Sequence, residues 1–132
     1  NDQKLINDLL SWMEINNADY TNTFCNLMNV NIEDKKVYED QKFINWVKIW
    51  EKRVLMNNNL KEKSLDLMRN TNPTVIPRNH KVEEALNAAN EDNFEVMNKL
   101  LNILNKPYSN QKNIENYQSL STDKEYQTFC GT

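Results

Sequence analysis

The sequence predicts an all-α protein, with a single helical domain of about six helices over residues 1–107 and an irregular C-terminal tail over residues 108–132. Apolar side chains recur at intervals of three and four residues in successive segments, which places them on one face of a helix. The three prolines fall between these segments, where their missing N–H group and fixed φ do not disturb a helix. No segment shows the apolar and polar alternation that indicates a strand.

The first two helices are predicted at residues 3–15 and 20–28. Asp19 precedes the second helix, where its carboxylate can accept hydrogen bonds from the free N–H groups of the first turn. Their apolar faces carry Leu5, Leu9 and Met13 in the first helix and Tyr20, Phe24 and Met28 in the second. The polar residues 29–39 are predicted to form a connection that contains a short turn of helix.

The third and fourth helices are predicted at residues 40–56 and 60–69. The third has the strongest periodicity in the sequence, with Phe43, Val47, Trp50 and Val54 at helical spacing. Two prolines then lie within residues 72–77, and we expect an extended loop there because proline fixes φ and removes a backbone donor.

Two helices are predicted after this loop, and each has its own start signal. Asn79 is predicted to cap the fifth helix, whose inner face carries Val82, Ala85, Leu86 and Ala89. Asp92 and Glu95 have the spacing of a capping box, which predicts that the last helix starts there and ends before Pro107. Beyond Tyr108 the periodicity is lost, and the tail is either pinned to the helices by its aromatic residues or ordered only by a missing partner.

Composition excludes several classes of site. The chain of 132 residues has one glycine, Gly131, so it contains no glycine-rich phosphate loop. With one histidine and two distant cysteines it contains neither a zinc-protease motif nor a zinc finger. A net charge of −3 without a basic stripe argues against a nucleic-acid partner, and no apolar run approaches the ~20 residues that cross a membrane.

The chain carries no secretion signal, so we expect a cytoplasmic protein with reduced cysteines. It starts at Asn1 rather than Met, and a helical stripe begins at once, which suggests a piece cut from a longer protein. The acidic pairs Glu33-Asp34, Glu83-Glu84 and Glu91-Asp92 are typical of a solvated helix face, and we assign them no catalytic role.

Arg78 and His80 are candidate contact residues because they place a guanidinium and an imidazole beside Asn79 at a helix start. This cluster could bind an anion at the helix N-terminus. The alternative is a structural anchor between the loop and the helix, which is the commoner role for such a cluster.

The two cysteines have different predicted roles. Cys130 lies three positions from the polar C-terminus, where an exposed thiol could meet a distant partner, or else it is buried behind Phe129. Cys25 lies on the apolar side of the second helix and is predicted to act as a small hydrophobe. A disulfide between the two is a less favoured alternative in a reducing compartment.

The order of several motifs resembles the C-terminal end of the selenoprotein O family. These are Asp-Tyr-Thr-Asn-Thr-Phe at 19–24, Asn-Pro-Thr-Val-Ile-Pro-Arg-Asn-His at 72–80, Val-Glu-Glu-Ala-Leu at 82–86 and Tyr-Gln-Thr-Phe-Cys-Gly-Thr at 126–132. The resemblance covers nearly the whole chain, and the block at 72–86 and the ending are its most specific parts.

The resemblance implies a protein adenylyltransferase with a protein-kinase-like fold, which uses ATP and Mg²⁺ or Mn²⁺ to move AMP onto protein hydroxyl groups. The residues that bind nucleotide and metal in the family lie in the kinase-like core, which would precede Asn1. The resemblance therefore implies no catalytic, cofactor-binding or metal-binding residue and no cofactor in this chain. Cys130 matches a redox cysteine or selenocysteine of the family, whose proposed partner thiol lies in the core.

Two hypotheses follow from the sequence. In the first, the chain is the helical C-terminal part of a selenoprotein O-like adenylyltransferase, inert alone, whose partners are the kinase-like core of the same chain and the protein substrates. Arg78 and His80 could then contact those substrates. In the second, the chain is an independent helical module whose polar, acidic surface binds a protein partner.

Overall fold

The computed structural model describes residues 1–56 and 61–122, and within these ranges it contains helices and no strand. The prediction of an all-α fold is therefore confirmed. The elements are α1 (Asp2–Asn16), α2 (Tyr20–Leu27), the 3₁₀ helix η1 (Lys36–Glu39), α3 (Gln41–Leu55), α4 (Lys61–Thr71), α5 (Asn79–Asn90), α6 (Glu95–Leu104) and α7 (Glu115–Gln118). No helix in these two ranges combines the length and apolarity that a membrane crossing needs.

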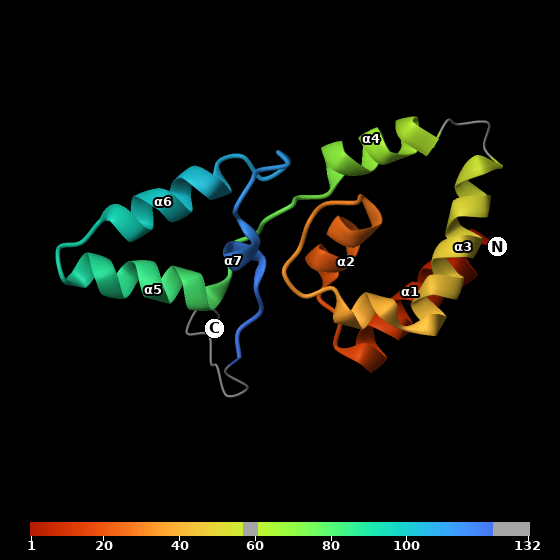
Figure 1. Ribbon diagram of the computed structural model, residues 1–132, viewed down its shortest axis with the longest axis horizontal. Coiled ribbons are helices and arrows are strands. Elements are labelled where there is room, and N and C mark those ends of the chain that lie inside the picture. Colours follow the sequence, from red (N-terminus) through yellow and green to blue (C-terminus); the bar gives the residue numbers. More distant parts are fainter. Residues whose placement is uncertain (57–60, 123–132) are drawn as a thin grey trace.

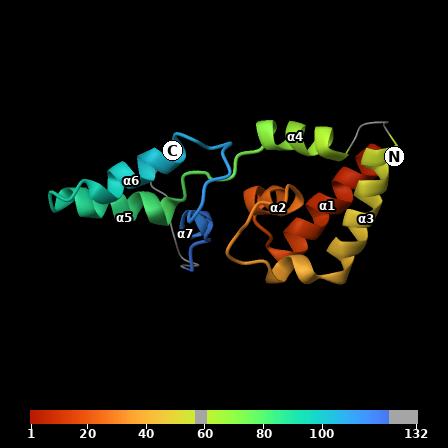
Figure 2. The same cartoon turned by 45° about the horizontal axis from the view of Figure 1, so that its top comes forward.

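The helices form two groups, which we call the N-terminal lobe (residues 1–71) and the C-terminal lobe (residues 79–122). Figures 1 and 2 show α1 to α4 on one side and α5 to α7 on the other. An extended linker, residues 72–78, runs from α4 to α5, and the segment after α6 returns toward the linker. The contact region between the lobes therefore involves α2, the linker and the segment around α7.

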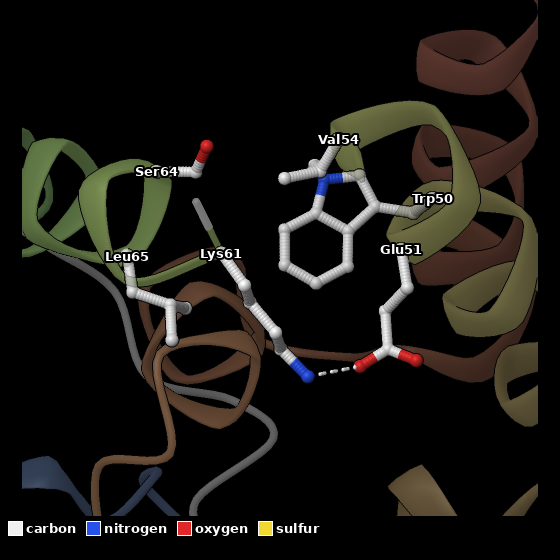
Figure 3. A pocket seen from close by; sticks show the side chains of 6 residues that line it. All are labelled: Trp50, Glu51, Val54, Lys61, Ser64 and Leu65. Carbon is white, nitrogen blue, oxygen red and sulfur yellow. Dashed lines mark hydrogen bonds and ion pairs between the residues drawn. The ribbon is translucent and has the colours of Figure 1, made fainter. Parts of the chain in front are cut away.

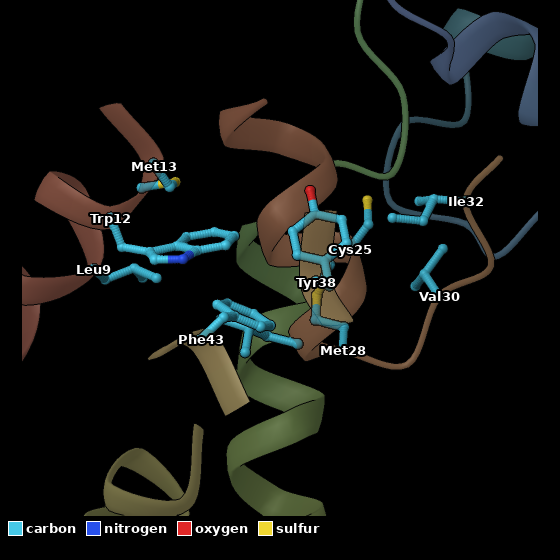
Figure 4. Close-up of a cluster of buried hydrophobic side chains, with 10 residues drawn as sticks. Leu9, Trp12, Met13, Cys25, Met28, Val30, Ile32, Tyr38 and Phe43 are labelled. Carbon is cyan, nitrogen blue, oxygen red and sulfur yellow. The ribbon is translucent and has the colours of Figure 1, made fainter. Parts of the chain in front are cut away.

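A single apolar cluster holds the N-terminal lobe together (Figure 4). Its buried members are Leu9, Trp12, Met13, Cys25, Leu27, Met28, Val30, Ile32, Tyr38 and Phe43. The ring of Phe43 lies 4.5 Å from that of Trp12 and 5.3 Å from that of Tyr38, within the range in which aromatic pairs stabilise a core.

Polar groups of the tryptophans fasten the same helices. The indole N–H of Trp12 donates to the carboxylate of Asp40 at 2.8 Å, and Asp40 also caps the first turn of α3. The indole N–H of Trp46 donates to the backbone carbonyl of Leu5 at 2.8 Å. Helices α1 and α3 are therefore joined by hydrogen bonds as well as by packing.

The C-terminal lobe has a thinner core. Helices α5 and α6 form an antiparallel hairpin in which α5 buries Ala85 and α6 buries Leu100 and Ile103. Ile103 joins Val75 of the linker and Ile114 near α7 in a small second cluster. This lobe is thus held to the linker by a few side chains.

The two sequence-predicted caps of the C-terminal lobe are wrong, whereas the cap at Asp19 is confirmed. Asn79 is already helical, and Arg78 occupies the cap position without a side-chain capping bond. The capping box at Asp92 and Glu95 also does not form. Asp92 adopts φ 59° in the turn, and the side chain of Asn93 accepts the N–H of Glu95 at 3.2 Å instead.

The irregular tail predicted from residue 108 onward contains one short helix, α7, in its described part. Helix α7 is a single turn, and both Gln118 within it and Ile114 just before it are buried. Tyr117 packs against the second cluster, which supports anchoring of this part of the tail to the helices. The other predicted aromatic anchors, Tyr126 and Phe129, lie outside the described residues.

Candidate functional site

Arg78 forms a largely buried ion pair with Asp19 that joins the two lobes. Its Nη1 donates to Oδ2 of Asp19 at 2.6 Å, and its Nη2 donates to Oδ1 at 2.8 Å. The two side chains are only 12% and 16% exposed. A planar guanidinium matches a carboxylate in this two-bond geometry, which is the strongest form of the pair. The structure thus favours the anchor interpretation of Arg78, and a contact with a protein substrate stays a prediction.

Asp19 serves two elements at once. Its Oδ1 accepts the backbone N–H of Asn22 at 2.8 Å and thereby caps α2. Burial alone would raise the pKa of Asp19, but the hydrogen bonds from Arg78 and Asn22 and the charge of Arg78 outweigh it. The pKa of Asp19 is therefore lowered, and the carboxylate is charged at neutral pH.

A second set of hydrogen bonds ties the linker to the tail. Gln118, which is 1% exposed, donates its Nε2 to the carbonyl of Thr74 at 2.6 Å. The hydroxyl of Thr74 donates to the carbonyl of Pro107 at 3.1 Å, and the side chain of Asn22 donates to the carbonyl of Gln118 at 3.0 Å. We call Asp19, Asn22, Thr74, Arg78 and Gln118 together the polar junction.

The hydrogen bonding of this junction is incomplete. In the described ranges, the buried side-chain atoms without a partner are Oδ1 of Asn22, Oε1 of Gln118 and Nε of Arg78. All three belong to the polar junction. An unpaired buried polar group lowers the stability of the folded protein by about 1–3 kcal/mol. Such groups therefore call for an explanation other than stability, for example a role in function. This makes the junction the strongest candidate site in the described part of the chain.

A cleft of about 520 Å³ lies beside the junction. It runs between α2, the segment around η1 and the residues that follow α7, and its lining includes Asp19, Glu33, Asp34 and Gln118. None of the described side chains that line it is basic. The carboxylates would repel a triphosphate and attract a cationic group.

His80 lies in the first turn of α5, close to the junction in sequence. Burial lowers its pKa, and the charges of Lys81 and Arg78 lower it further. The imidazole is therefore neutral at physiological pH and offers no positive charge to an anion. Because Arg78 is paired with Asp19 as well, neither residue offers a free positive charge to an anion, which argues against the anion-binding interpretation of this cluster.

Cys25 is the small buried hydrophobe that its position predicted. It is 0% exposed and a free thiol, and its sulfur donates weakly to the carbonyls of Pro73 and Thr74 at 3.7 Å. Burial raises its pKa to about 11, so it holds no reactive thiolate at neutral pH. Cys130, the partner in the less favoured disulfide alternative, lies outside the described residues.

One further hollow is too small for a ligand. Figure 3 shows a crevice between α3 and α4, in which Lys61 reaches past Trp50 to form an ion pair with Glu51 at 2.7 Å. Its volume is about 10 Å³, roughly the space of one water molecule. It is a packing gap that the ion pair closes.

The acidic pairs are solvent-exposed as predicted, but only Glu83 and Glu84 lie on a helix face, because Glu33 and Asp34 lie in a loop and Glu91 and Asp92 in a turn. Both members of each pair are exposed: Glu33 and Asp34, Glu83 and Glu84, and Glu91 and Asp92. Among the residues with described placement, no three histidine, cysteine or acidic side chains come together as metal ligands.

Sequence reasoning missed most of the polar junction. Asp19 was predicted as a helix cap but not as the partner of Arg78, which lies 59 residues away in the chain. Gln118 was placed in an irregular tail and received no role. The available signal was the pair of polar motifs around Asp19 and Arg78, because each contains a charged residue at a helix start.

Comparison with known proteins finds matches to one family. The model of the family described as "Protein adenylyltransferase SelO" matches residues 1–105. The chain is 48% identical over 133 aligned residues to a "Protein nucleotidyltransferase YdiU" from Pelagibacter ubique, which covers 99% of this chain and 28% of that relative. Relatives of the same name from Clostridium botulinum and Bacillus cereus are 47% and 44% identical, each over 99% of this chain.

The chain spans 27% to 28% of the length of these relatives. No solved structure matches the chain.

Proposed function

Because this chain belongs to the family of the protein adenylyltransferase SelO, we propose that it is the helical C-terminal part of a protein nucleotidyltransferase and supports a catalytic part that lies elsewhere in the protein. One observation carries this proposal: the similarity reaches 48% identity across 99% of this chain but only 28% of the relative. The remaining length of such a relative leaves room for a catalytic domain of ordinary size.

The proposed reaction is AMP transfer from ATP to a protein hydroxyl group. The hydroxyl oxygen bonds to the α-phosphorus, the bond between the α- and β-phosphates breaks, pyrophosphate leaves, and the hydroxyl proton passes to a base. ATP and Mg²⁺ or Mn²⁺ would bind to a kinase-like core, and none of the residues described here would hold them. The acidic lining of the junction cleft supports this division, because Glu33 and Asp34 would repel the phosphates.

In this proposal the helical part contributes structure and a redox group. The N-terminal lobe supplies a rigid body through its apolar cluster, and the polar junction sets the place of the C-terminal lobe. Cys130 would be the redox group and would pair with a thiol of the core, since Cys25 is buried and has a raised pKa.

The first test is transfer of AMP from ATP labelled at the α-phosphate. We expect label on protein hydroxyl groups when the full-length protein is incubated with ATP and Mg²⁺, and no label with residues 1–132 alone. Chelation of the metal is the matched control and should abolish the label. Label on residues 1–132 alone would contradict the assignment of catalysis to another part, and the independent-module alternative predicts no label from either protein.

The second test concerns the thiol. We expect an oxidant-dependent shift in electrophoretic mobility of the full-length protein, which Cys130→Ser abolishes. Cys25→Ser is the matched control and should preserve the shift, because the buried thiol does not react. A shift that survives Cys130→Ser would remove the redox role of this residue.

A further inference from the structure

The α5–α6 hairpin exposes apolar side chains that its own core does not need. Leu86 in α5, Phe94 just before α6 and Leu101 in α6 are each about half exposed. Helix α5 buries only Ala85, and α6 buries only Leu100 and Ile103. Short helices gain most of their stability from packing of an apolar face, so this hairpin has packed one face and left another uncovered.

These exposed side chains lie on one face of the hairpin. Leu86 follows the buried Ala85 by one residue, and Leu101 follows the buried Leu100 by one residue. When two antiparallel helices pack against each other, the residue that follows a contact residue lies on the same side of the pair in both helices. Met97 and Phe94 extend this stripe along α6 at intervals of four and three residues before Leu101.

The charges around this face favour one kind of binding partner over another. The exposed acidic side chain of Glu83 lies one helical turn before Leu86 in α5, and Glu91 and Asp92 lie in the turn between the two helices. A second copy of the same face would bring these carboxylates against one another, which is unfavourable. An apolar surface bordered by lysine or arginine would complement the face instead.

We propose that the face formed by Leu86, Phe94, Met97 and Leu101 docks the helical part onto the remaining part of the same protein, through an apolar patch bordered by basic residues. This inference rests on the proposed function, because the relatives are more than three times as long as the segment that this chain matches. The C-terminal lobe would then connect the well-packed N-terminal lobe to the catalytic part.

The test is thiol footprinting of the native full-length protein in a Cys130→Ser background. Leu101→Cys reports on the proposed face, and Leu67→Cys is the matched control because Leu67 is an exposed leucine on α4. Alkylation of each position is quantified by peptide mass spectrometry. Since reaction follows access to the thiolate, we expect Leu101→Cys to react at least about tenfold more slowly than Leu67→Cys.

Each outcome decides the proposal. Equal alkylation of the two positions would overturn it, and so would protection of Leu101→Cys that disappears on dilution to the monomer, which would assign the face to a second copy. Leu86→Cys is a second probe if Leu101→Cys does not fold. AMP transfer is measured separately on the same protein: transfer with an unprotected face would overturn the docking alone, and protection without transfer would overturn only the proposed function.

Discussion

Among the residues that the structure describes, the N-terminal lobe buries ten apolar side chains in one cluster, whereas the cluster of the C-terminal lobe has three, one of them supplied by the linker. The lobes also differ in polar content, because the junction that holds the C-terminal lobe in place depends on the Arg78–Asp19 pair and on Gln118. One lobe is thus specified by packing and the other by hydrogen bonds and charge. The difference indicates that the C-terminal lobe depends more on what it contacts.

The largest expected effect is in the N-terminal lobe. Phe43→Ala removes a ring that packs against Trp12 and Tyr38, and we expect it to lower the free energy of unfolding by about 3–5 kcal/mol. Denaturant titration followed by tryptophan fluorescence measures this. Ile49→Ala, at an exposed position on α3, is the control and should change it by roughly 0.5 kcal/mol or less. Equal losses of unfolding free energy in the two variants would mean that the cluster is not the main source of stability in this lobe.

The next effect is at the junction. Arg78→Met leaves the carboxylate of Asp19 buried without its partner, and we expect a loss of about 3 kcal/mol. The double variant Asp19→Asn with Arg78→Met should recover part of this loss, because it removes the uncompensated charge. Arg69→Met, which breaks an exposed pair with Asp66, should cost about 1 kcal/mol or less. If the double variant is as unstable as Arg78→Met, the buried charge is not the cause.

A smaller effect is expected at Gln118. Gln118→Ala removes the donor to the carbonyl of Thr74 and should destabilise the docking of the tail by about 1–2 kcal/mol. Amide hydrogen exchange of residues 114–118 measures it, and faster exchange confined to this segment is the expected result. Gln3→Ala, at an exposed position on α1, should leave that exchange unchanged. Unchanged exchange in Gln118→Ala would show that the segment is held by Ile114 and Tyr117 instead.

The smallest effect is a pH dependence of the junction. The pKa of Asp19 is lowered in the folded protein from its ordinary value of 3.8, so the stability that this shift contributes is complete above pH 3.8. It is lost as the pH falls through the lower folded pKa. Denaturation of wild type and Asp19→Asn should therefore differ most above pH 3.8 and converge in stronger acid. A difference that does not change with pH would contradict the charged pair.

Local rules predicted most of the helices. Phe43, Val47 and Trp50 determined the third helix because a repeating apolar face is a property of neighbouring residues, and the structure places it at Gln41–Leu55. The cap at Asp19 was also predictable, since a side chain and the N–H groups that it caps lie within three residues. The same local rule failed at Asn79, where the preceding Arg78 stays extended while its side chain binds Asp19.

The polar junction could not be predicted in this way, because its partners are far apart in sequence. Gln118 and Thr74 are 44 residues apart, and neither has a local feature that points to the other. Helix α7 was missed for a related reason. Its single turn has too few residues to show a periodic pattern, and it is stabilised by burial of Ile114 and Gln118 rather than by propensity.

The distribution of aromatic residues has a spectroscopic consequence. All three tryptophans, Trp12, Trp46 and Trp50, belong to the N-terminal lobe, whereas the aromatic residues of the C-terminal lobe from α6 to α7 are Phe94, Tyr108 and Tyr117. Indole emission excited at the red edge therefore follows the N-terminal lobe alone, whereas tyrosine absorbance follows both lobes, because Tyr20 and Tyr38 lie in one and Tyr108 and Tyr117 in the other. A chain with no added dye can thus show whether the two halves melt together or one after the other.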